Sequence, residues 1–328
     1  MYSFNFNNIN ESYKCLISAI LEGGKRISPR GLETLELSPV SITINNPLEN
    51  IIYSDARKLN YGFMLGELTW ILQKSDDMNH ICWYNKNWSN FSDDGKTLNG
   101  AYGKRIFDYG SKHINQFDKV VELLKEDPES RQGTIVLFDP SLDFLKTKDK
   151  PCTNLMRFSI RNNKLNMIVF MRSNDIMFGY PYDVFNFTSL QVIMASKLNV
   201  KVGIYTHVVD SLHMYMNQID WCKDILNEKD FNLYEGHVFD RPTTENDIQT
   251  FINIEQTTRK LANKIEFAHI VKMLNDMDSP YWKSNAAFLA LYNYRKNKKD
   301  NKFLNKLHPF ITNELIYILN KYKSLLKE

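Results

Sequence analysis

A proline–cysteine pair followed by two strand-like runs most constrains how the middle of this 328-residue chain can fold. Pro151-Cys152 stands just before the strand-like run 154–161, and a second such run covers 164–172. Asn162-Asn163 between them is typical of a tight turn, so the two runs are predicted to form a β-hairpin. The hairpin brings the cysteine close to Arg172-Ser173-Asn174-Asp175 at the end of the second strand. A thiol beside a cation is a candidate nucleophile, because the thiolate is the reactive form.

A carboxylate follows this hairpin after the turn Gly179-Tyr180-Pro181. Asp183 stands where a helix is predicted to begin, over residues 184–198. Such a carboxylate can form hydrogen bonds with the polar edge of a ligand, and the Arg-Ser-x-Asp group before it is suited to binding an anion. Taken alone, Cys152 has the ordinary alternative of a buried structural cysteine, and Arg172 that of a surface ion pair.

The bulk composition indicates a chain with a large buried core and nearly balanced numbers of basic and acidic residues. Hydrophobic residues make up 43% and aromatic residues 13%, and 41 basic against 38 acidic residues leave a net charge of +3. This balance argues against a nucleic-acid-binding surface. The four cysteines are widely spaced, as in reduced intracellular proteins, so we expect a cytoplasmic protein. The sequence predicts neither a signal peptide nor a membrane span.

The remaining pattern predicts helices around a sheet that is mostly not built from βαβ units, which is an α+β fold. Residues 31–45 alternate as a strand or bent hairpin, and residues 296–302 form a charged break predicted to be a solvated loop. Further strands are predicted at 132–138 and 202–215, and further helices at 9–21, 62–74, 114–126, 244–263, 267–276, 281–296 and 311–326.

In this order, Pro-Cys, Arg-Ser-x-Asp, Gly-x-Pro and a polar residue resemble the core of the thymidylate synthase family. The resemblance spans roughly residues 10–225. It implies a large mixed sheet with surrounding helices, a homodimer, and 5,10-methylenetetrahydrofolate as co-substrate without a metal. We expect a catalytic domain over 1–240 and a helical C-terminal extension, 241–328, packed on it.

The resemblance also implies roles for individual residues. Cys152 corresponds to the nucleophile, Glu67 to the glutamate that organises proton transfer, and Tyr102 to an active-site tyrosine. The implied nucleotide contacts are Arg30, Arg131, Arg172, Ser173, Asp183, His213 and Tyr215, with Arg131 reaching across the dimer. The implied folate contacts are Trp88, Asp175 and Gly179.

Several departures from the family pattern bear on the reaction. Asp183 replaces an asparagine that matches uracil, whereas a carboxyl group can accept from the cytosine N4 amino group and, when protonated, donate to N3. Thr153 replaces a histidine, Met171 replaces a glutamine, and one arginine is missing beside Arg131. The tail that closes over folate in the synthases is not recognisable.

These features favour a cytidylate 5-hydroxymethylase that transfers a one-carbon unit to C5 and lets water complete the hydroxymethyl group. Ser173 favours dCMP slightly over CMP. The alternatives are C5 methylation of dCMP or dUMP, and a catalytically silent relative that binds nucleotide or RNA. Whether the product belongs to modified DNA or to a nucleoside antibiotic stays open.

Overall fold

The computed structural model describes residues 1–228, 242–260, 267–298 and 304–321. The chain forms two compact units, and each is described by itself. The first unit comprises Met1–Leu59 and Leu98–Leu233, and the second comprises Asn60–Thr97 and Tyr234–Glu328.

The first unit is built on a mixed sheet that has eight strands within the described residues, in the order β1-β4-β8-β7-β6-β5. Strand β3 also pairs with β8, and β2 pairs with β3. The pairs β1–β4 and β7–β8 are parallel, and the others are antiparallel. The strands are β1 Tyr2–Phe6, β2 Lys25–Ile27, β3 Thr34–Leu37, β4 Val40–Ile44, β5 Thr134–Val136, β6 Thr153–Arg161, β7 Lys164–Asp175 and β8 Lys201–Tyr215.

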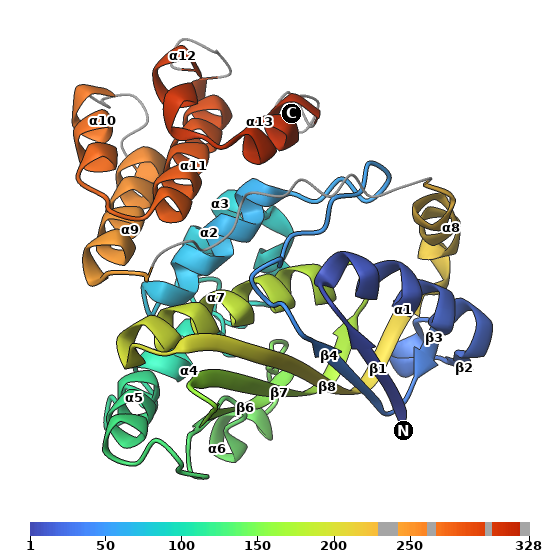
Figure 1. Cartoon of the computed structure of the whole chain (residues 1–328). Coiled ribbons are helices and arrows are strands. Elements are labelled where there is room, and N and C mark those ends of the chain that lie inside the picture. The colour runs from blue at the N-terminus through green and yellow to red at the C-terminus, as the bar shows by residue number, and fades with distance from the viewer. Residues whose placement is uncertain (229–241, 261–266, 299–303, 322–328) are drawn as a thin grey trace. The chain divides into compact units, whose positions relative to one another are not determined.

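Helices cover one face of this sheet, with α1 and α7 lying over it in Figure 1. Strands β7 and β8 turn alternate side chains, such as Met167 and Tyr205, into the core beneath α7. The helices of this unit are α1 Ile9–Gly23, α4 Tyr102–Phe107, α5 Gln116–Glu126, α6 Pro140–Asp143, α7 Tyr180–Leu198 and α8 Ile219–Asn227, with short 3₁₀ turns at η1 Pro29–Gly31 and η3 Met216–Gln218. This arrangement confirms the predicted α+β class and the mixed sheet.

The predicted hairpin is present. Strands β6 and β7 pair antiparallel, and Asn162 and Asn163 between them have φ of 52° and 57°. Asparagine tolerates this left-handed conformation better than most residues, which explains why the pair marks the turn. Residues 31–45 form a bent pair of strands and not a hairpin, because β3 and β4 each pair with β8 and not with each other.

The second unit is helical in its described residues. Its elements are α2 Tyr61–Leu72, α3 Met78–Tyr84, η2 Lys86–Phe91, α9 Glu245–Lys260, α10 Phe267–Asn275, α11 Pro280–Lys298, α12 Leu304–Leu307, η4 His308–Phe310 and α13 Asn313–Lys321. Helix α2 packs closely here because it carries glycines. A Cβ atom at Gly62 would lie 2.3 Å from the Tyr292 ring, and one at Gly66 would lie 2.5 Å from the Tyr84 ring.

The second unit contains a segment from early in the sequence as well as the C-terminal helices. The predicted single boundary at residue 240 does not include this segment. Asn60–Thr97 belongs with the second unit, although it lies early in the sequence. The assignment of a catalytic domain to 1–240 stays a prediction. The charged break predicted at 296–302 is helical up to Lys298, and residues 299–303 lie outside the described part of the chain.

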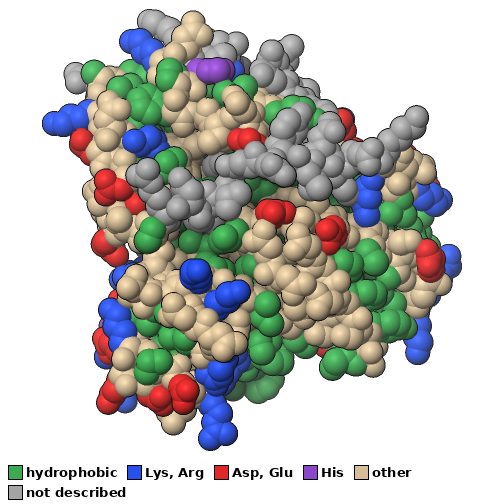
Figure 2. All heavy atoms as spheres, in the orientation of Figure 1, with side chains coloured by type: hydrophobic (Ala, Val, Ile, Leu, Met, Phe, Trp, Pro, Cys, Tyr) green, Lys and Arg blue, Asp and Glu red, His purple; other side chains and the backbone are tan. Residues whose placement is uncertain are grey.

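The visible surface is mixed in charge. Figure 2 shows acidic and basic side chains interspersed over the face that it draws. Among the helices described, none is both long enough and apolar enough to cross a membrane.

Candidate active site

Cys152 lies immediately before β6, and the end of β7 holds it in place. The Arg172 backbone N–H donates to the Cys152 carbonyl at 2.9 Å, and the Arg172 guanidinium donates to the Pro151 carbonyl at 3.0 Å. Its Nη2 atom lies 3.7 Å from the Cys152 sulfur. Burial raises the pKa of the thiol, although Arg172 and Arg30 act in the opposite direction. The predicted cation is therefore beside the thiol, but burial outweighs it in the protein alone.

Tyr102, from the first turn of α4, contacts the residue after the cysteine. Its hydroxyl oxygen accepts from the Thr153 hydroxyl at 2.9 Å and from the Thr153 backbone N–H at 3.3 Å. The pKa of Tyr102 is raised well above its ordinary value by burial, with Asp183 and Cys152 adding to the shift. Thr153, the departure from the family histidine, is thus used to fix Tyr102 beside the thiol.

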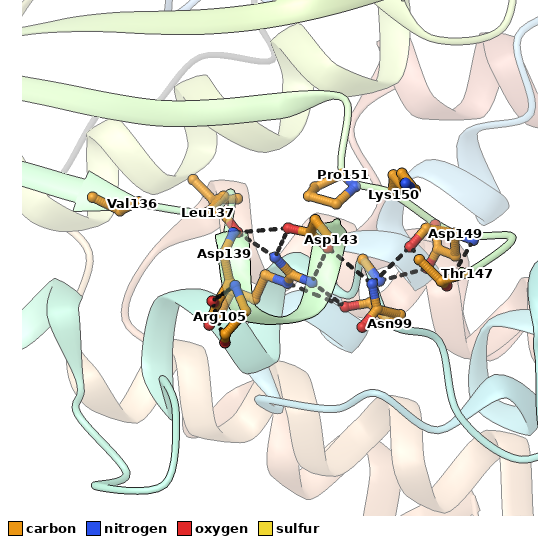
Figure 3. A network of polar contacts seen from close by, with 12 residues as sticks. Asn99, Arg105, Val136, Leu137, Asp139, Asp143, Thr147, Asp149, Lys150 and Pro151 are labelled. Carbon is orange, nitrogen blue, oxygen red and sulfur yellow. Dashed lines mark hydrogen bonds and ion pairs between the residues drawn. The ribbon is translucent and has the colours of Figure 1, made fainter. Parts of the chain in front are cut away.

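A buried ion pair anchors the loop that leads to the cysteine (Figure 3). The Arg105 guanidinium contacts the Asp143 carboxylate at 2.6 and 2.8 Å, and both side chains are at most 5% exposed. Asn99 donates to Asp143 at 2.9 Å and to the Asp149 carbonyl at 2.9 Å, while the Gly100 N–H donates to the Asp149 carboxylate at 2.6 Å. Residues 99–105 therefore hold both ends of the loop 143–149, just before the cysteine.

Removing the arginine of this pair is expected to destabilise the protein strongly. Burial alone would raise the pKa of Asp143, but the Arg105 hydrogen bonds hold it below its usual value, so the carboxylate stays charged. Arg105→Ala leaves that buried charge unpaired, which costs about 3–5 kcal/mol. The free energy of unfolding in urea measures the loss. Lys104→Ala is the matched control, because Lys104 is 41% exposed and pairs with Asp108 on the helix surface.

An unchanged unfolding curve for Arg105→Ala would contradict the anchor. The pH dependence offers a second check with a fixed sign. A depressed carboxyl pKa contributes stability at neutral pH, and acidification through that pKa removes the contribution. We therefore expect the stability difference between wild type and Arg105→Ala to shrink as the solution is acidified.

Two of the predicted phosphate-binding arginines lie on the same side of the first unit as the thiol. Arg30 is exposed in the turn η1, and it affects the pKa of both Cys152 and Tyr215. Arg172 is exposed beside the sulfur, and Ser173 next to it pairs with β8. Together they offer two guanidinium groups near the nucleophile, which suits a phosphate group.

The predicted sugar contacts lie on β8, next to the end of β7. His213 pairs in register with Asp175, and its carbonyl accepts from the Ile176 N–H at 2.9 Å. The rings of His213 and Tyr215 meet edge to face at 5.5 Å. Burial raises the pKa of Tyr215, and Arg30 opposes this shift. These side chains therefore belong to the cluster around Cys152.

Asp183 is held at the start of α7 by an asparagine. The Asn174 amide donates to the Asp183 carboxyl at 2.6 Å, and the Asp183 backbone N–H donates to the Gly179 carbonyl at 2.9 Å. Burial raises the pKa of Asp183 to about 7, with the Asn174 hydrogen bond acting against the rise and Asp175 adding to it. Asp183 can therefore exist as the neutral acid or as the carboxylate near neutral pH.

Asp175 and Gly179, which are predicted as folate contacts, lie in the first unit and shape the turn before α7. The Asp175 carboxylate accepts from the Met177 N–H at 2.6 Å and from the Phe178 N–H at 3.1 Å. Gly179 lies against the end of β7, where a Cβ atom would come within 2.7 Å of the Asn174 amide nitrogen. Beside this turn, the ring of Phe178 is 56% exposed and packs against Trp221 at 5.7 Å.

Three of the predicted site residues are not gathered into this cluster by the geometry described. Glu67 lies on α2 and Trp88 on η2, so both belong to the second unit and are described only within it. There Trp88 packs against Trp70 at 6.0 Å. Arg131 is exposed before β5, and its carbonyl accepts from the Arg157 guanidinium.

The sequence did not single out Asn174, His207 or Arg57, which are buried polar groups in or near the cluster. Arg57 donates twice to the Met177 carbonyl, at 3.0 and 2.7 Å, and its guanidinium lies 5.2 Å from the Trp221 ring centroid. Asparagine is depleted in strands, so Asn174 at a buried strand position was a usable signal. Arg57 follows no pattern that sequence periodicity would detect.

Comparison with known proteins is consistent with this geometry. The family model for thymidylate synthase matches residues 11–266. A deoxyuridylate hydroxymethyltransferase of Bacillus phage SP01 is 34% identical over 228 residues, which cover 66% of this chain and 60% of that protein. A protein of the same name from Pseudomonas phage M6 is 30% identical over 205 residues, covering 62% of this chain and 58% of that protein.

Thymidylate synthases are also similar to this chain. The enzyme of Buchnera aphidicola subsp. Baizongia pistaciae is 25% identical over 238 residues, which cover 71% of this chain and 89% of that protein. The chain spans about 60% of the length of the two phage relatives.

Proposed function

Because this chain belongs to the thymidylate synthase family, we propose that it is a folate-dependent one-carbon transferase that hydroxymethylates C5 of a pyrimidine nucleotide. The substrate that we propose is cytidylate, with dCMP ahead of CMP. The observation that carries this choice is Asp183, whose pKa of about 7 lets the carboxyl group hold a proton near neutrality. A carboxyl group that shares a proton with the basic N3 of cytosine, and accepts from N4, matches that base.

In the proposed mechanism Cys152 is the nucleophile that adds to C6 of the pyrimidine. The bond from sulfur to C6 places negative charge at C5, which then forms the new carbon–carbon bond. Arg172 is the cation closest to the sulfur, and it would stabilise the thiolate once a nucleotide excludes water. Tyr102 is placed to hold or move a proton next to the ring. Loss of the C5 proton to a base, together with cleavage of the carbon–nitrogen bond to tetrahydrofolate, which leaves without being oxidised, would give an exocyclic methylene on the ring. Addition of water to this carbon and departure of the thiolate would then give the 5-hydroxymethyl product.

Methylenetetrahydrofolate, the co-substrate of the family, would supply the one-carbon unit when bound. The first unit offers a fitting surface for its flat ring in the exposed face of Phe178, next to Asp175. Trp88 and Glu67 are assigned by resemblance to the folate stack and to proton transfer. Arg30, Arg172 and Ser173 are assigned to the phosphate, and His213 and Tyr215 to the sugar.

A second candidate substrate is deoxyuridylate. The phage relatives carry that substrate in their names, and a neutral carboxyl group can also accept from N3–H and donate to O4 of uracil. Uracil O4 is a much weaker base than cytosine N3, so the shared proton favours cytosine. The names of the relatives favour uracil.

The deciding experiment gives the protein methylenetetrahydrofolate with dCMP, CMP or dUMP and analyses the nucleotides by mass spectrometry. We expect a 5-hydroxymethylcytidylate and no dihydrofolate, since dihydrofolate forms only if the carbon unit is reduced to a methyl group. Release of tritium from C5 of the labelled nucleotide reports the first step separately. A preference for dUMP would refute the cytidylate assignment, and absence of tritium release from every nucleotide would refute the enzyme assignment.

We also propose a homodimer formed through the open face of the sheet. Val136, Leu155, Phe170 and Val208 lie directly opposite one another across β5, β6, β7 and β8. They point away from α7, and the side chains of Val136 and Phe170 are 38% and 37% exposed. An apolar row of this kind across a wide sheet is typical of a subunit interface, and a second copy of the chain carries the same row.

Replacing one side chain in that row is expected to break the dimer. Phe170→Asp places a charge on the apolar face, so sedimentation or light scattering should report a monomer, with activity lost if Arg131 serves the partner's nucleotide. The Arg157 guanidinium on this face bonds the Arg131 carbonyl, which puts Arg131 at its border. Lys201→Asp, at the exposed start of β8, is the control. A wild-type monomer, or a Phe170→Asp dimer, would contradict the proposal.

A further inference from the structure

We propose that Asn174 is a positioning residue that orients Asp183 and sets the pH range over which this carboxyl group gains and loses its proton. The expected effect on recognition of the pyrimidine base rests on the proposed function. Asn174 lies at the end of β7, and Asp183 lies nine residues later in the first turn of α7. The 2.6 Å contact between their side chains closes the turn between strand and helix.

A line of buried groups stands behind this contact. The Asn174 carbonyl oxygen faces His207 Nε2 at 3.2 Å, and His207 Nδ1 faces the Tyr205 hydroxyl at 2.7 Å. His207 and Tyr205 lie on β8, and both are fully buried. The line therefore runs from the core of the sheet to the carboxyl group at the site.

The direction of each hydrogen bond in this line follows from the neutral state of His207 together with the orientation of the Asn174 amide, whose oxygen faces the imidazole ring. Burial lowers its pKa to about 3, so the imidazole is neutral and has one N–H. An amide oxygen only accepts, so His207 Nε2 must donate to Asn174, and Nδ1 accepts from the Tyr205 hydroxyl. The Asn174 NH₂ group is then left to donate to Asp183. In this arrangement the amide oxygen is bound by the core, and Asn174 acts as a donor to the carboxyl group.

A fixed donor favours the ionised form of Asp183. Burial raises the Asp183 pKa, and the Asn174 hydrogen bond limits the rise, so that the carboxyl group changes its protonation state close to neutrality. The titratable groups that act on Asp183 or respond to it in the described part of the first unit are Asp175 on β7, Cys152 before β6, Tyr102 on α4 and Tyr205 on β8. None of these four is a cation, so opposition to protonation of Asp183 comes from the hydrogen bond that the Asn174 amide donates.

The Asn174 amide has room beside the backbone of residue 179 because that residue is a glycine. A Cβ atom at Gly179 would lie 2.7 Å from the Asn174 amide nitrogen and 3.0 Å from the Asp175 carbonyl oxygen. Any larger residue at 179 would push the amide away from Asp183. Gly179 therefore offers an independent way to disturb the same contact.

The experiment follows the Asp183 carboxyl group by ¹³C NMR titration of protein labelled at aspartate Cγ, with Asp183→Asn identifying its signal. We expect Asn174→Ala to raise the Asp183 pKa by about one unit, since a hydrogen bond to the charged form is lost. Asn166→Ala is the matched control on the same strand, because Asn166 accepts from the Ile204 N–H and not from the site. Should Asn174→Ala not fold, Gly179→Ala is expected to shift the pKa in the same direction.

A second experiment measures the affinity of the protein for dCMP as a function of pH and tests the functional consequence. Because the proposed pairing needs the acid form, wild-type affinity should fall as the pH rises above about 7, and the fall should move about one unit higher in Asn174→Ala. An unchanged Asp183 titration in Asn174→Ala and Gly179→Ala overturns the inference. A shifted titration without any nucleotide binding would support the role of Asn174 at the carboxyl group and would instead refute the proposed function.

Discussion

Replacing Cys152 with alanine is expected to abolish turnover and the release of tritium from C5 of the nucleotide. Turnover and tritium release both require a covalent bond between the sulfur and C6, and alanine has no thiol that could form this bond. We expect a loss of at least about 10⁴-fold in kcat, on the scale seen when an essential nucleophile is removed. Single-turnover assays with labelled nucleotide measure it.

The same variant should still bind nucleotide. The arginines assigned to the phosphate, Arg30 and Arg172, do not depend on the sulfur, and Arg172 is held by the Pro151 and Lys150 carbonyls. Cys15→Ala is the control, because Cys15 is an exposed thiol on α1. Retained turnover in Cys152→Ala, or equal loss in Cys15→Ala, would refute the assignment of the nucleophile.

The parts of the site that sequence predicted are those that local chain geometry determines. A hairpin turn at Asn162-Asn163 places Pro151-Cys152 beside Arg172, and these residues can be related by counting along two strands. The helix predicted over 184–198 is present, but it begins earlier, at Tyr180, so the Gly-x-Pro segment is part of its start and Asp183 lies in its first turn. Local propensity and alternation carry this information.

The parts that were missed depend on contacts between distant segments. Strand β1 is a short edge strand whose parallel pairing with β4 is made across a helix. The Arg105–Asp143 pair joins the short helices α4 and α6 across 38 residues of sequence, and neither residue is marked by a periodic pattern. Asn174 occupies the unspecified position of Arg-Ser-x-Asp, and the sequence does not show that it contacts Asp183 nine residues later.

The grouping of residues 60–97 with the C-terminal helices was missed for the same reason. It depends on small residues of α2 that admit large rings from elsewhere. The rings of Tyr84 and Tyr292 stack at 6.0 Å and pack against Gly66 and Gly62. A glycine in a helix pattern indicates close packing of some kind, but not which partner approaches.

Asp183→Asn is expected to reduce the preference for cytidylate over deoxyuridylate by at least about 100-fold in the ratio of kcat/KM values. The amide keeps the shape of the carboxyl group and one donor and one acceptor, so the fold and the Asn174 contact should persist. It cannot share a proton with cytosine N3, and that charge-assisted hydrogen bond is the one that distinguishes the two bases. The measurement compares dCMP, CMP, dUMP and UMP on both proteins.

The pH profile separates this explanation from a general loss of fit. In the wild type, the Asp183 pKa near 7 should make dCMP binding weaken on the alkaline side, whereas an amide does not titrate. Asp183→Asn should therefore bind dCMP weakly and with no inflection near pH 7. If wild type already prefers deoxyuridylate, or if the substitution leaves both the ratio and the pH profile unchanged, the base is read by other groups. In that case the substrate named for the phage relatives becomes the better assignment for this chain.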